Sequence, residues 1–248
     1  MSIWEFANPV RFMRLSGKLL PYFAAATALT LIPALIWGFF FTADDYKQGA
    51  TVKIIFVHVP SAFLAINIYF MMFVASLIWL IRRHHVSALA AKAAAPVGAI
   101  MTLIALITGA VWGQPIWGTW WVWDPRLTAF LIMFIFYIGY IALWAAIDEA
   151  EKAADLTSIL CMIGSVFAVV SRYAVEFWNQ GLHQGKSLVL VPLPNGEVVE
   201  KPPLDPSYAW PLLLAGVGFL LLFLTLLLLR TRTEIRNRRI TALRAREA

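Results

Sequence analysis

The sequence predicts an all-α polytopic membrane protein, a single domain over residues 1–248 with six transmembrane helices. Three observations support this fold class. Hydrophobic residues make up 61% of the chain and charged residues only 14%, whereas a soluble domain carries about 25% charged residues. Several stretches of about 20 residues contain few or no charges, and this is the length that a helix needs to cross a bilayer. The lysine and arginine residues gather at the ends of these stretches and in the C-terminal tail.

The six predicted spans follow one another along the whole chain. They cover residues 19–41, 54–81, 93–112, 128–147, 156–175 and 210–229. The sixth is close to a leucine run and is expected to face lipid on most sides. Residues 1–18 mix aromatic and basic side chains, which is typical of a segment that lies on the membrane surface. Residues 176–209 are rich in proline, so the second half of this loop is expected to be extended and irregular.

The distribution of positive charge predicts that both termini are cytoplasmic. Fourteen of the 20 Lys and Arg residues fall in the N-terminal stretch, the second and fourth loops and the tail, and six fall on the other side of the spans. Loops rich in Lys and Arg stay on the cytoplasmic side. The tryptophan-rich loop, residues 113–127, and the long outer loop, residues 176–209, then face the periplasm. The basic tail, residues 230–248, is expected to contact membrane lipid.

Several classes of function are excluded by what the chain lacks. The net charge of +6 could indicate a nucleic-acid partner, but the basic residues form no basic-aromatic surface for a phosphate backbone, so no nucleic acid is expected. Cys161 is the one cysteine, and without a Cys-x-x-Cys-His motif the chain cannot carry a covalent c-type haem. It also lacks the Gly-x-x-x-x-Gly-Lys-Ser/Thr phosphate loop, so an ATPase would have to be a partner chain.

Five tryptophans within residues 112–123 form the densest chemical feature, in the sequence WGQPIWGTWWVWDPRLT. Tryptophan offers a flat apolar face with one N–H donor at its edge. If this loop is a short helix, Trp117, Trp120, Trp121 and Asp124 fall on one face. The pattern predicts a platform for a large, flat, apolar ligand. The alternative is an interfacial anchoring belt, which normally places one or two tryptophans at a span end.

Two of the four histidines fall on the same predicted side of the membrane as the tryptophans. His58 lies near the outer start of the second span and His183 lies in the outer loop, whereas His84 and His85 fall on the inner side and are expected to be solvated. Two neutral imidazoles can fill both axial positions of a haem iron. Taken alone, His58 could equally form a hydrogen bond at a helix end, and His183 could be a solvated loop residue.

Three charged residues flank the predicted platform. Arg126 and Arg172 are outward cations that could pair with haem propionates, because a guanidinium matches a carboxylate in a bidentate fork. For Arg172, simple extension to the membrane interface is the preferred interpretation. Asp124 could orient a ligand histidine or fix the loop.

The motif WGTWWVWDPRLT resembles the WWD signature of the haem-handling proteins of cytochrome c maturation. The HVP sequence at residues 58–60 and the WN-x-x-LHQG block that contains His183 are also similar to these proteins. Six spans, 248 residues and one WWD loop resemble their small member, the haem exporter protein C (CcmC) family of system I. The resemblance covers nearly the whole chain. Residues 189–206 form a longer proline-rich insertion than this family's pattern predicts.

The resemblance implies a haem-presenting subunit that carries no catalytic residue of its own. Haem b is expected to bind non-covalently and transiently at the periplasmic face of the bacterial inner membrane, with His58 and His183 as axial ligands. The other residues expected to bind it are Trp117, Gly118, Trp120, Trp121, Trp123, Asp124 and Arg126. The implied partners are a periplasmic haem chaperone, the ATPase and membrane subunits of an ABC-type complex, and a small one-span subunit.

Two other functions are open to the same residues. A transmembrane haem transporter would need a polar path, but polar side chains such as Asn67 and Thr108 are sparse within the spans, and charges are missing from the span centres. A b-type cytochrome subunit for electron transfer usually holds haem between spans with buried histidines, whereas His58 lies near an interface. Haem that is retained permanently would favour the cytochrome, and haem that is lost to a chaperone would favour delivery.

Overall fold

Six long helices form the structure, and they confirm the predicted fold class. The computed structural model describes residues 8–178, 189–192, 198–201 and 205–247. Within these residues, six helices are long and apolar enough to cross a membrane. The helices are α1 (Pro9–Phe40), α2 (Ile55–Arg82), α3 (His85–Trp117), α4 (Pro125–Ala146), α5 (Ala150–Phe177) and α6 (Pro206–Glu247), and a short 3-10 helix, η2 (Ala50–Ile54), precedes α2.

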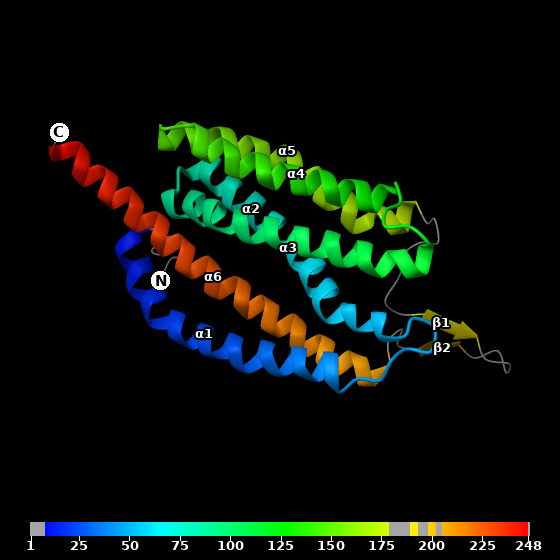
Figure 1. The fold of residues 1–248 in the computed structure, drawn as a ribbon. Coiled ribbons are helices and arrows are strands. Elements are labelled where there is room, and N and C mark those ends of the chain that lie inside the picture. The colour runs from blue at the N-terminus through cyan, green and yellow to red at the C-terminus, as the bar shows by residue number, and fades with distance from the viewer. Residues whose placement is uncertain (1–7, 179–188, 193–197, 202–204, 248) are drawn as a thin grey trace.

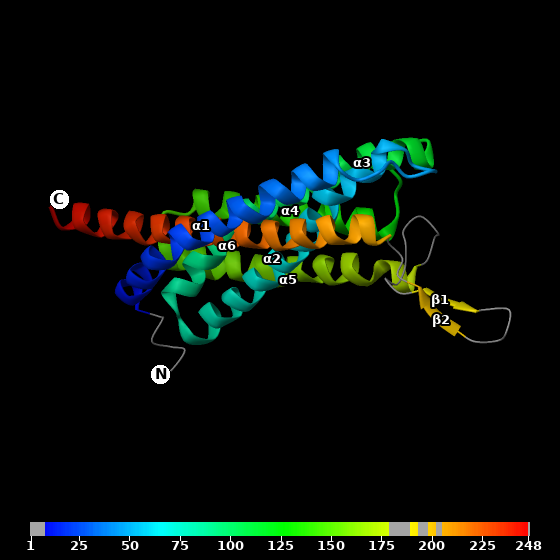
Figure 2. The same cartoon turned by 90° about the horizontal axis from the view of Figure 1, so that it is seen from below.

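Successive helices run up and down, so that their connections alternate between two ends of the molecule (Figure 1). Helix α1 packs along α6, α2 to α5 pack against one another, and α6 joins the two groups through α3 and α2. The start of α1, the end of α6 and the α2–α3 and α4–α5 connections lie together (Figure 2). We call this the basic end; it carries Arg11, Arg14, Lys18, Arg82, Arg83, Lys92, Lys152 and the arginines from Arg230 onward.

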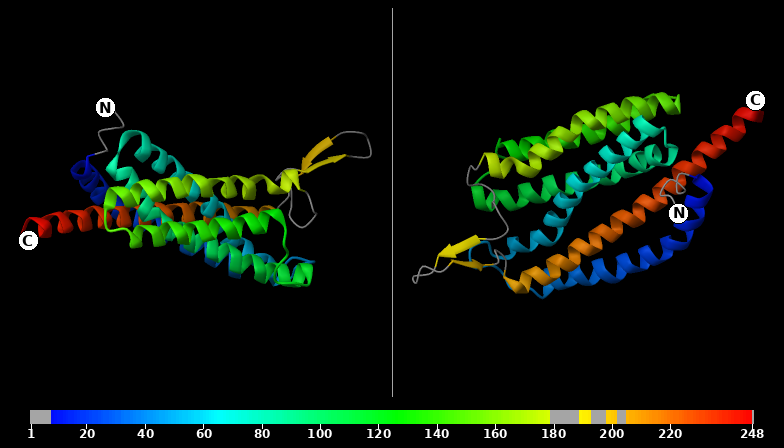
Figure 3. Two further views of the ribbon diagram at one scale, coloured as in Figure 1. Left: turned by 90° about the horizontal axis from the view of Figure 1, so that it is seen from above. Right: turned by 180° about the vertical axis from the view of Figure 1, so that it is seen from behind.

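The opposite end, which we call the tryptophan end, holds the α1–α2 connection, the α3–α4 loop (residues 118–124) and the start of α6 (Figure 3). The same end carries a small antiparallel hairpin of β1 (Val189–Pro192) and β2 (Val198–Lys201), with Val189 paired to Lys201. The sequence predicted this stretch to be extended but irregular. Its β-branched valines favour paired strands, and Pro192, which has no N–H to donate, stands at the end of its strand.

The core lies where α2, α3 and α4 meet. Tyr69 and Tyr137 are fully buried, and their rings pack edge to face with centroids 4.8 Å apart. The Tyr137 hydroxyl donates to the carbonyl of Ala65 at 2.7 Å. Gly98 of α3 is essential to this contact, since a Cβ atom there would lie 2.4 Å from the Tyr137 ring. A small residue on α3 therefore lets the helices approach closely, as is usual between membrane helices.

The helices extend beyond the apolar stretches that the sequence marks as spans. Residues 9–18 form the first turns of α1, whereas the sequence suggested a separate surface segment. Asn8 caps this helix by accepting from the amide of Val10, and Pro9 occupies its first position, which are both favourable at a helix start. Helix α6 has 42 residues, about twice the number needed to cross a bilayer, because the basic tail continues the helix as far as Glu247.

Candidate functional site

Helix α3 carries the first two tryptophans and then ends abruptly. The helix continues to Trp117, and Gly118 stops it with a φ of 74°, a left-handed conformation that glycine adopts without steric cost. Residues 118–124 then run to α4 without helical structure. The condition under which Trp117, Trp120, Trp121 and Asp124 would share one helical face is therefore not met. The reason is that Gly118 ends α3 directly after Trp117.

Trp112 and Trp117 form the fixed part of the cluster. Their rings meet edge to face with centroids 5.5 Å apart. The indole N–H of Trp112 donates to the side-chain oxygen of Gln48 at 2.8 Å, which ties α3 to the α1–α2 connection. Trp117 packs over Gly113, where a Cβ atom would lie only 2.8 Å from the indole. Gly113 therefore allows the Trp117 ring to lie flat against its own helix.

The tryptophans of the α3–α4 loop form the open part of the cluster. Trp120 is 60% exposed and Trp123 is 74% exposed. Trp121 is partly buried and packs edge to face against Trp123, with centroids 5.6 Å apart. The indole N–H of Trp121 is buried and has no hydrogen-bond acceptor among the described residues. The loop thus exposes two indoles and packs a third, partly buried indole against one of them.

Asp124 and Pro125 fix the far end of this loop. The Asp124 carboxylate is buried and accepts from the amide of Leu127 at 2.6 Å, so it caps α4. Pro125 occupies the first position of the helix, where its missing N–H has no cost. Of the two roles considered for Asp124, this geometry supports fixing the loop.

Arg126 lies in the first turn of α4, directly after this cap. Its side chain is partly buried and lies within electrostatic range of Asp124 and Arg172. Arg172 of α5 is exposed, and its guanidinium lies 5.9 Å from the centre of the Tyr173 ring. The structure therefore brings the two predicted propionate partners near each other at the tryptophan end.

His58 stands in the first turns of α2 and faces α3. Its Nδ1 atom lies 2.9 Å from the hydroxyl of Thr108, and that hydroxyl donates to the carbonyl of Ile104 at 2.6 Å. A threonine hydroxyl has one hydrogen, and with that hydrogen directed to Ile104 the hydroxyl accepts at its contact with His58. This assignment places the proton of a neutral imidazole on Nδ1 and its lone pair on Nε2.

The same face of α3 links His58 to the tryptophans. Thr108 and Trp112 are four residues apart, so they lie one above the other on one side of the helix. Gly109 lies beside the imidazole, and a Cβ atom there would lie 3.0 Å from Cε1 of His58. The structure thus places His58 about one helical turn from the tryptophan cluster. His183, the other predicted ligand, lies outside the described residues.

The two remaining histidines lie at the basic end and have structural roles. His84 caps α3, because its Nδ1 atom accepts from the amide of Ser87 at 3.0 Å. His85 packs against Trp79, with ring centroids 5.4 Å apart. The sequence predicted both to be solvated, and His85 is exposed and His84 only partly buried; the cap itself depends on the tight turn at Arg83, with its positive φ of 52°. That turn positions His84 at the start of the next helix.

Sequence reasoning did not find the residues that support the site. Thr108 appeared there only as a sparse polar residue within a span, and Gln48 was not singled out. Their partners, His58 and Trp112, are 50 and 64 residues away along the chain. The one available signal was a polar side chain placed one turn from a tryptophan in an otherwise apolar helix.

The fold and the site together define a multi-pass membrane protein that presents a tryptophan-rich surface at one end of a six-helix bundle. The family described as "Heme exporter protein C" (CcmC) matches residues 2–246 of the chain. The chain therefore belongs to the haem exporter protein C family, as the WWD motif indicated.

Relatives from several bacteria extend over the same length. A protein named "Heme exporter protein C" from Paracoccus denitrificans is 66% identical over 247 residues, covering 100% of this chain and 99% of that protein. The protein of the same name from Rhodobacter capsulatus has the same identity and coverage. The one from Escherichia coli K12 is 41% identical over 234 residues, covering 94% of this chain and 91% of its own length.

Proposed function

We propose that the protein binds haem at the tryptophan end and delivers it for cytochrome c maturation. The family assignment supports a role in haem delivery. The observation that carries the proposal is the position of His58, which contacts Thr108 on α3, one helical turn before Trp112, the first of the five tryptophans. An imidazole, which can bind a metal, at the end of a bundle that also exposes aromatic faces is a combination that suits haem and few other ligands.

The exposed indoles fit a porphyrin. Trp120 and Trp123 offer flat apolar faces that a soluble surface would normally cover. Gly118 adds no side chain, so a planar ligand can approach the backbone there. The buried N–H of Trp121 lacks an acceptor among the described residues, and such a donor is satisfied when a ligand brings an oxygen close to it. These residues, with Trp117 at the end of α3, would hold the ring.

The axial and polar contacts follow from the same geometry. Bound haem supplies an iron whose axial positions accept imidazole nitrogen. The Nε2 atom of His58 carries the lone pair, because Thr108 holds the proton on Nδ1. We assign His183 as the second axial ligand. We prefer Arg126 to Arg172 as the partner of a propionate, because Arg126 lies in the first turn of α4, directly after the Asp124 cap. A guanidinium binds a carboxylate strongly.

Delivery requires that the haem remain accessible and non-covalent. The open position of Trp120 and Trp123 meets the first condition, since their faces are exposed before any partner binds. The recipient we propose is a haem chaperone on the periplasmic side of the bacterial inner membrane. The basic end would then face the cytoplasm, as the positive-inside rule predicts. Energy for the cycle would come from the ATPase and membrane subunits of an ABC-type complex, with a small one-span subunit as a further member.

The absorption spectrum of the purified protein, co-expressed with the chaperone, tests this proposal. We expect a Soret band in the wild type that weakens or shifts in His58→Ala and in His183→Ala. His85→Ala is the matched control, because His85 lies at the basic end, and its spectrum should equal that of the wild type. A folded wild-type protein without haem would overturn the proposal. Normal haem content in both single mutants would overturn the axial assignment.

A further inference from the structure

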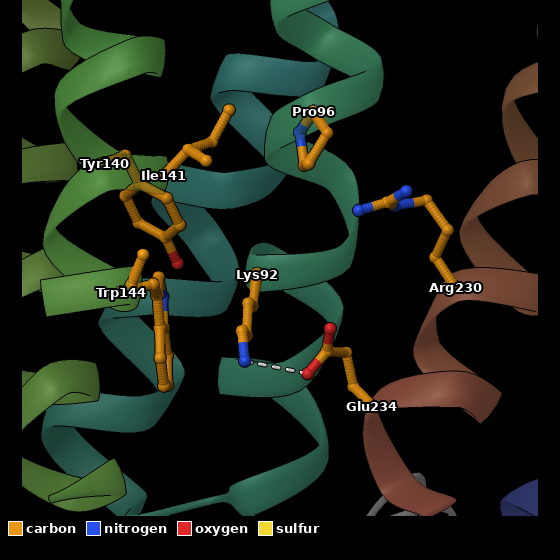
Figure 4. Close-up of a pocket in the computed structure, with 8 residues that line it drawn as sticks. Lys92, Pro96, Tyr140, Ile141, Trp144, Arg230 and Glu234 are labelled. Atoms are coloured by element: carbon orange, nitrogen blue, oxygen red, sulfur yellow. Dashed lines mark ion pairs between the residues drawn. The ribbon is translucent and has the colours of Figure 1, made fainter. Parts of the chain in front are cut away.

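A cavity at the basic end lies between α3, α4 and α6, far from the tryptophan end. Its volume is about 230 Å³, which is below the usual range of about 300–1,000 Å³ for pockets that enclose a whole organic ligand. It is therefore too small for a porphyrin but large enough for one polar group. Figure 4 shows that its lining includes charged side chains from two helices and aromatic side chains from the third.

Arg230 of α6 reaches across to α3 at the edge of this cavity. Pro96 has no N–H, so the carbonyl of Lys92, four residues before it on α3, lacks its usual helical donor. The Nε atom of Arg230 donates to the nearby carbonyl of Ala93 at 3.0 Å. That bond uses one of the five N–H donors of the guanidinium and leaves both terminal nitrogens for other acceptors.

Lys92 brings a second positive charge to the cavity. Its ammonium lies 2.8 Å from the carboxylate of Glu234 and 4.8 Å from the centre of the Trp144 ring. Figure 4 shows Lys92 and Glu234 paired below Arg230. Two cations and one carboxylate line the cavity, so it keeps a net positive charge. A positive cavity that is partly shielded from water attracts an anion more strongly than exposed charges do.

Trp144 supplies a further donor in the same wall. Its side chain is 9% exposed, and its indole N–H lies within interaction range of the Tyr140 hydroxyl but forms no hydrogen bond of good geometry among the described residues. Tyr140 lies beside it on α4, and its hydroxyl also faces the cavity (Figure 4). Buried indole N–H groups usually find an acceptor. An oxygen-rich anion in the cavity would provide one.

The depth of the cavity indicates what kind of anion reaches it. Arg230 directly follows the apolar run of residues 212–229, and Trp144 lies two residues before the end of α4. Both residues therefore stand at the level where the apolar core of a bilayer gives way to headgroups, the usual position of tryptophan and arginine. Basic pockets between membrane helices at this level bind anionic lipid headgroups.

We propose that this cavity binds the phosphate group of an anionic phospholipid. The terminal nitrogens of Arg230 and the ammonium of Lys92 hold the phosphate oxygens, and the Trp144 indole N–H donates to one of them. The acyl chains remain in the bilayer beside α3, α4 and α6. Glu234 competes with the phosphate for Lys92 and so limits the affinity.

Native mass spectrometry of the full chain in detergent tests this, with phosphatidylglycerol and phosphatidylcholine added in turn. We expect a phosphatidylglycerol adduct that Arg230→Gln weakens about fivefold, the usual contribution of one basic residue near an anionic lipid surface. Lys47→Gln is the control, because Lys47 is an exposed basic residue of the α1–α2 connection, at the opposite end of the bundle from the cavity; its adduct should equal that of the wild type. Equal binding by the Arg230 variant and the wild type would overturn the proposal.

A second variant separates lipid binding from a purely structural role of the charges. Glu234→Gln removes the competing carboxylate, so we expect it to strengthen the phosphatidylglycerol adduct. If it weakens the adduct as Arg230→Gln does, the charged residues only join α3 to α6 and the proposal fails. Inorganic phosphate is then added as a competitor. Displacement of the lipid by inorganic phosphate would show that the cavity takes free phosphate instead and would also overturn the proposal.

Discussion

The Nδ1 atom of His58 and the hydroxyl of Thr108 lie 2.9 Å apart and join α2 to α3 just inside the tryptophan end. Because the Thr108 hydroxyl already donates to Ile104, this contact determines which imidazole nitrogen carries the proton. A side chain that fixes the tautomer of a ligand histidine also fixes the direction of its lone pair. The relationship makes Thr108 a positioning residue for the proposed haem site.

Thr108→Val should weaken haem binding about tenfold, which is the usual effect of losing the hydrogen-bond partner of a metal-bound histidine. Thr108→Ser keeps the hydroxyl and should restore binding. Haem titration followed at the Soret band measures the affinity, and the reduction potential of the bound haem gives an independent readout of the histidine. If valine and serine give the same affinity and potential as threonine, Thr108 does not act through His58.

Replacing both Trp120 and Trp123 with alanine should reduce haem affinity by at least about tenfold, since each indole contributes a large apolar face. Both side chains are exposed, so the free energy of unfolding should change by less than about 0.5 kcal/mol.

Trp112→Ala should instead lower the free energy of unfolding by about 1–3 kcal/mol, because it breaks the hydrogen bond to Gln48. Haem titration and thermal unfolding in detergent measure the two effects. Loss of the folded protein in the double mutant would instead indicate a structural role for the loop indoles.

Gly98→Ala should destabilise the bundle by about 1–3 kcal/mol, as overpacking in a tight core does. The added Cβ atom would lie 2.4 Å from the buried Tyr137 ring. Gly216→Ala in α6 is the matched control, since no heavy atom beyond its chain neighbours and the nearby backbone of its own helix lies within 4 Å of the added Cβ atom. That change should be neutral or slightly stabilising, because alanine favours a helix. Thermal unfolding of the two variants in one detergent compares them, and equal melting temperatures would contradict the packing described.

The α2–α3 turn should lose stability as the pH falls below 6.5. Partial burial lowers the pKa of His84 from its usual value of 6.5, and the neighbouring His85 lowers it further. The unfolded chain therefore binds a proton at a higher pH than the folded chain does. The stabilisation is complete above pH 6.5 and decreases as the pH falls toward the lower pKa of the folded state. Protonation also removes the Nδ1 acceptor that caps α3.

His84→Asn tests this pH dependence, because asparagine is a good helix cap that does not titrate. Hydrogen exchange at the amide of Ser87, followed between pH 5 and pH 8 and corrected for its intrinsic rate, measures the local stability. Protection of the Ser87 amide from exchange should decrease in the wild type as the pH is lowered, and it should stay constant in the variant. A parallel fall in both proteins would assign the effect to other groups.

The six helices were predictable from sequence because a span requires a run of apolar residues, and such runs are local. The tryptophan cluster was also recognisable from sequence, because its members lie close together along the chain. The course of its loop was not, since it depends on the left-handed conformation of Gly118, which a helical wheel does not represent. The environment of His58 was also out of reach, because Thr108 is distant in sequence and comes near only when α2 packs on α3. The role of His183 stays a prediction.

The α3–α4 loop, which carries the exposed tryptophans, is short and is fixed at both ends, by the left-handed Gly118 and by the Asp124 cap. A short loop that is fixed at both ends loses little conformational entropy when a ligand binds. It has equally little to regain when the ligand leaves. The exchange of cargo between this surface and an acceptor would therefore be governed by the difference between their contacts, and not by any folding or unfolding of the loop.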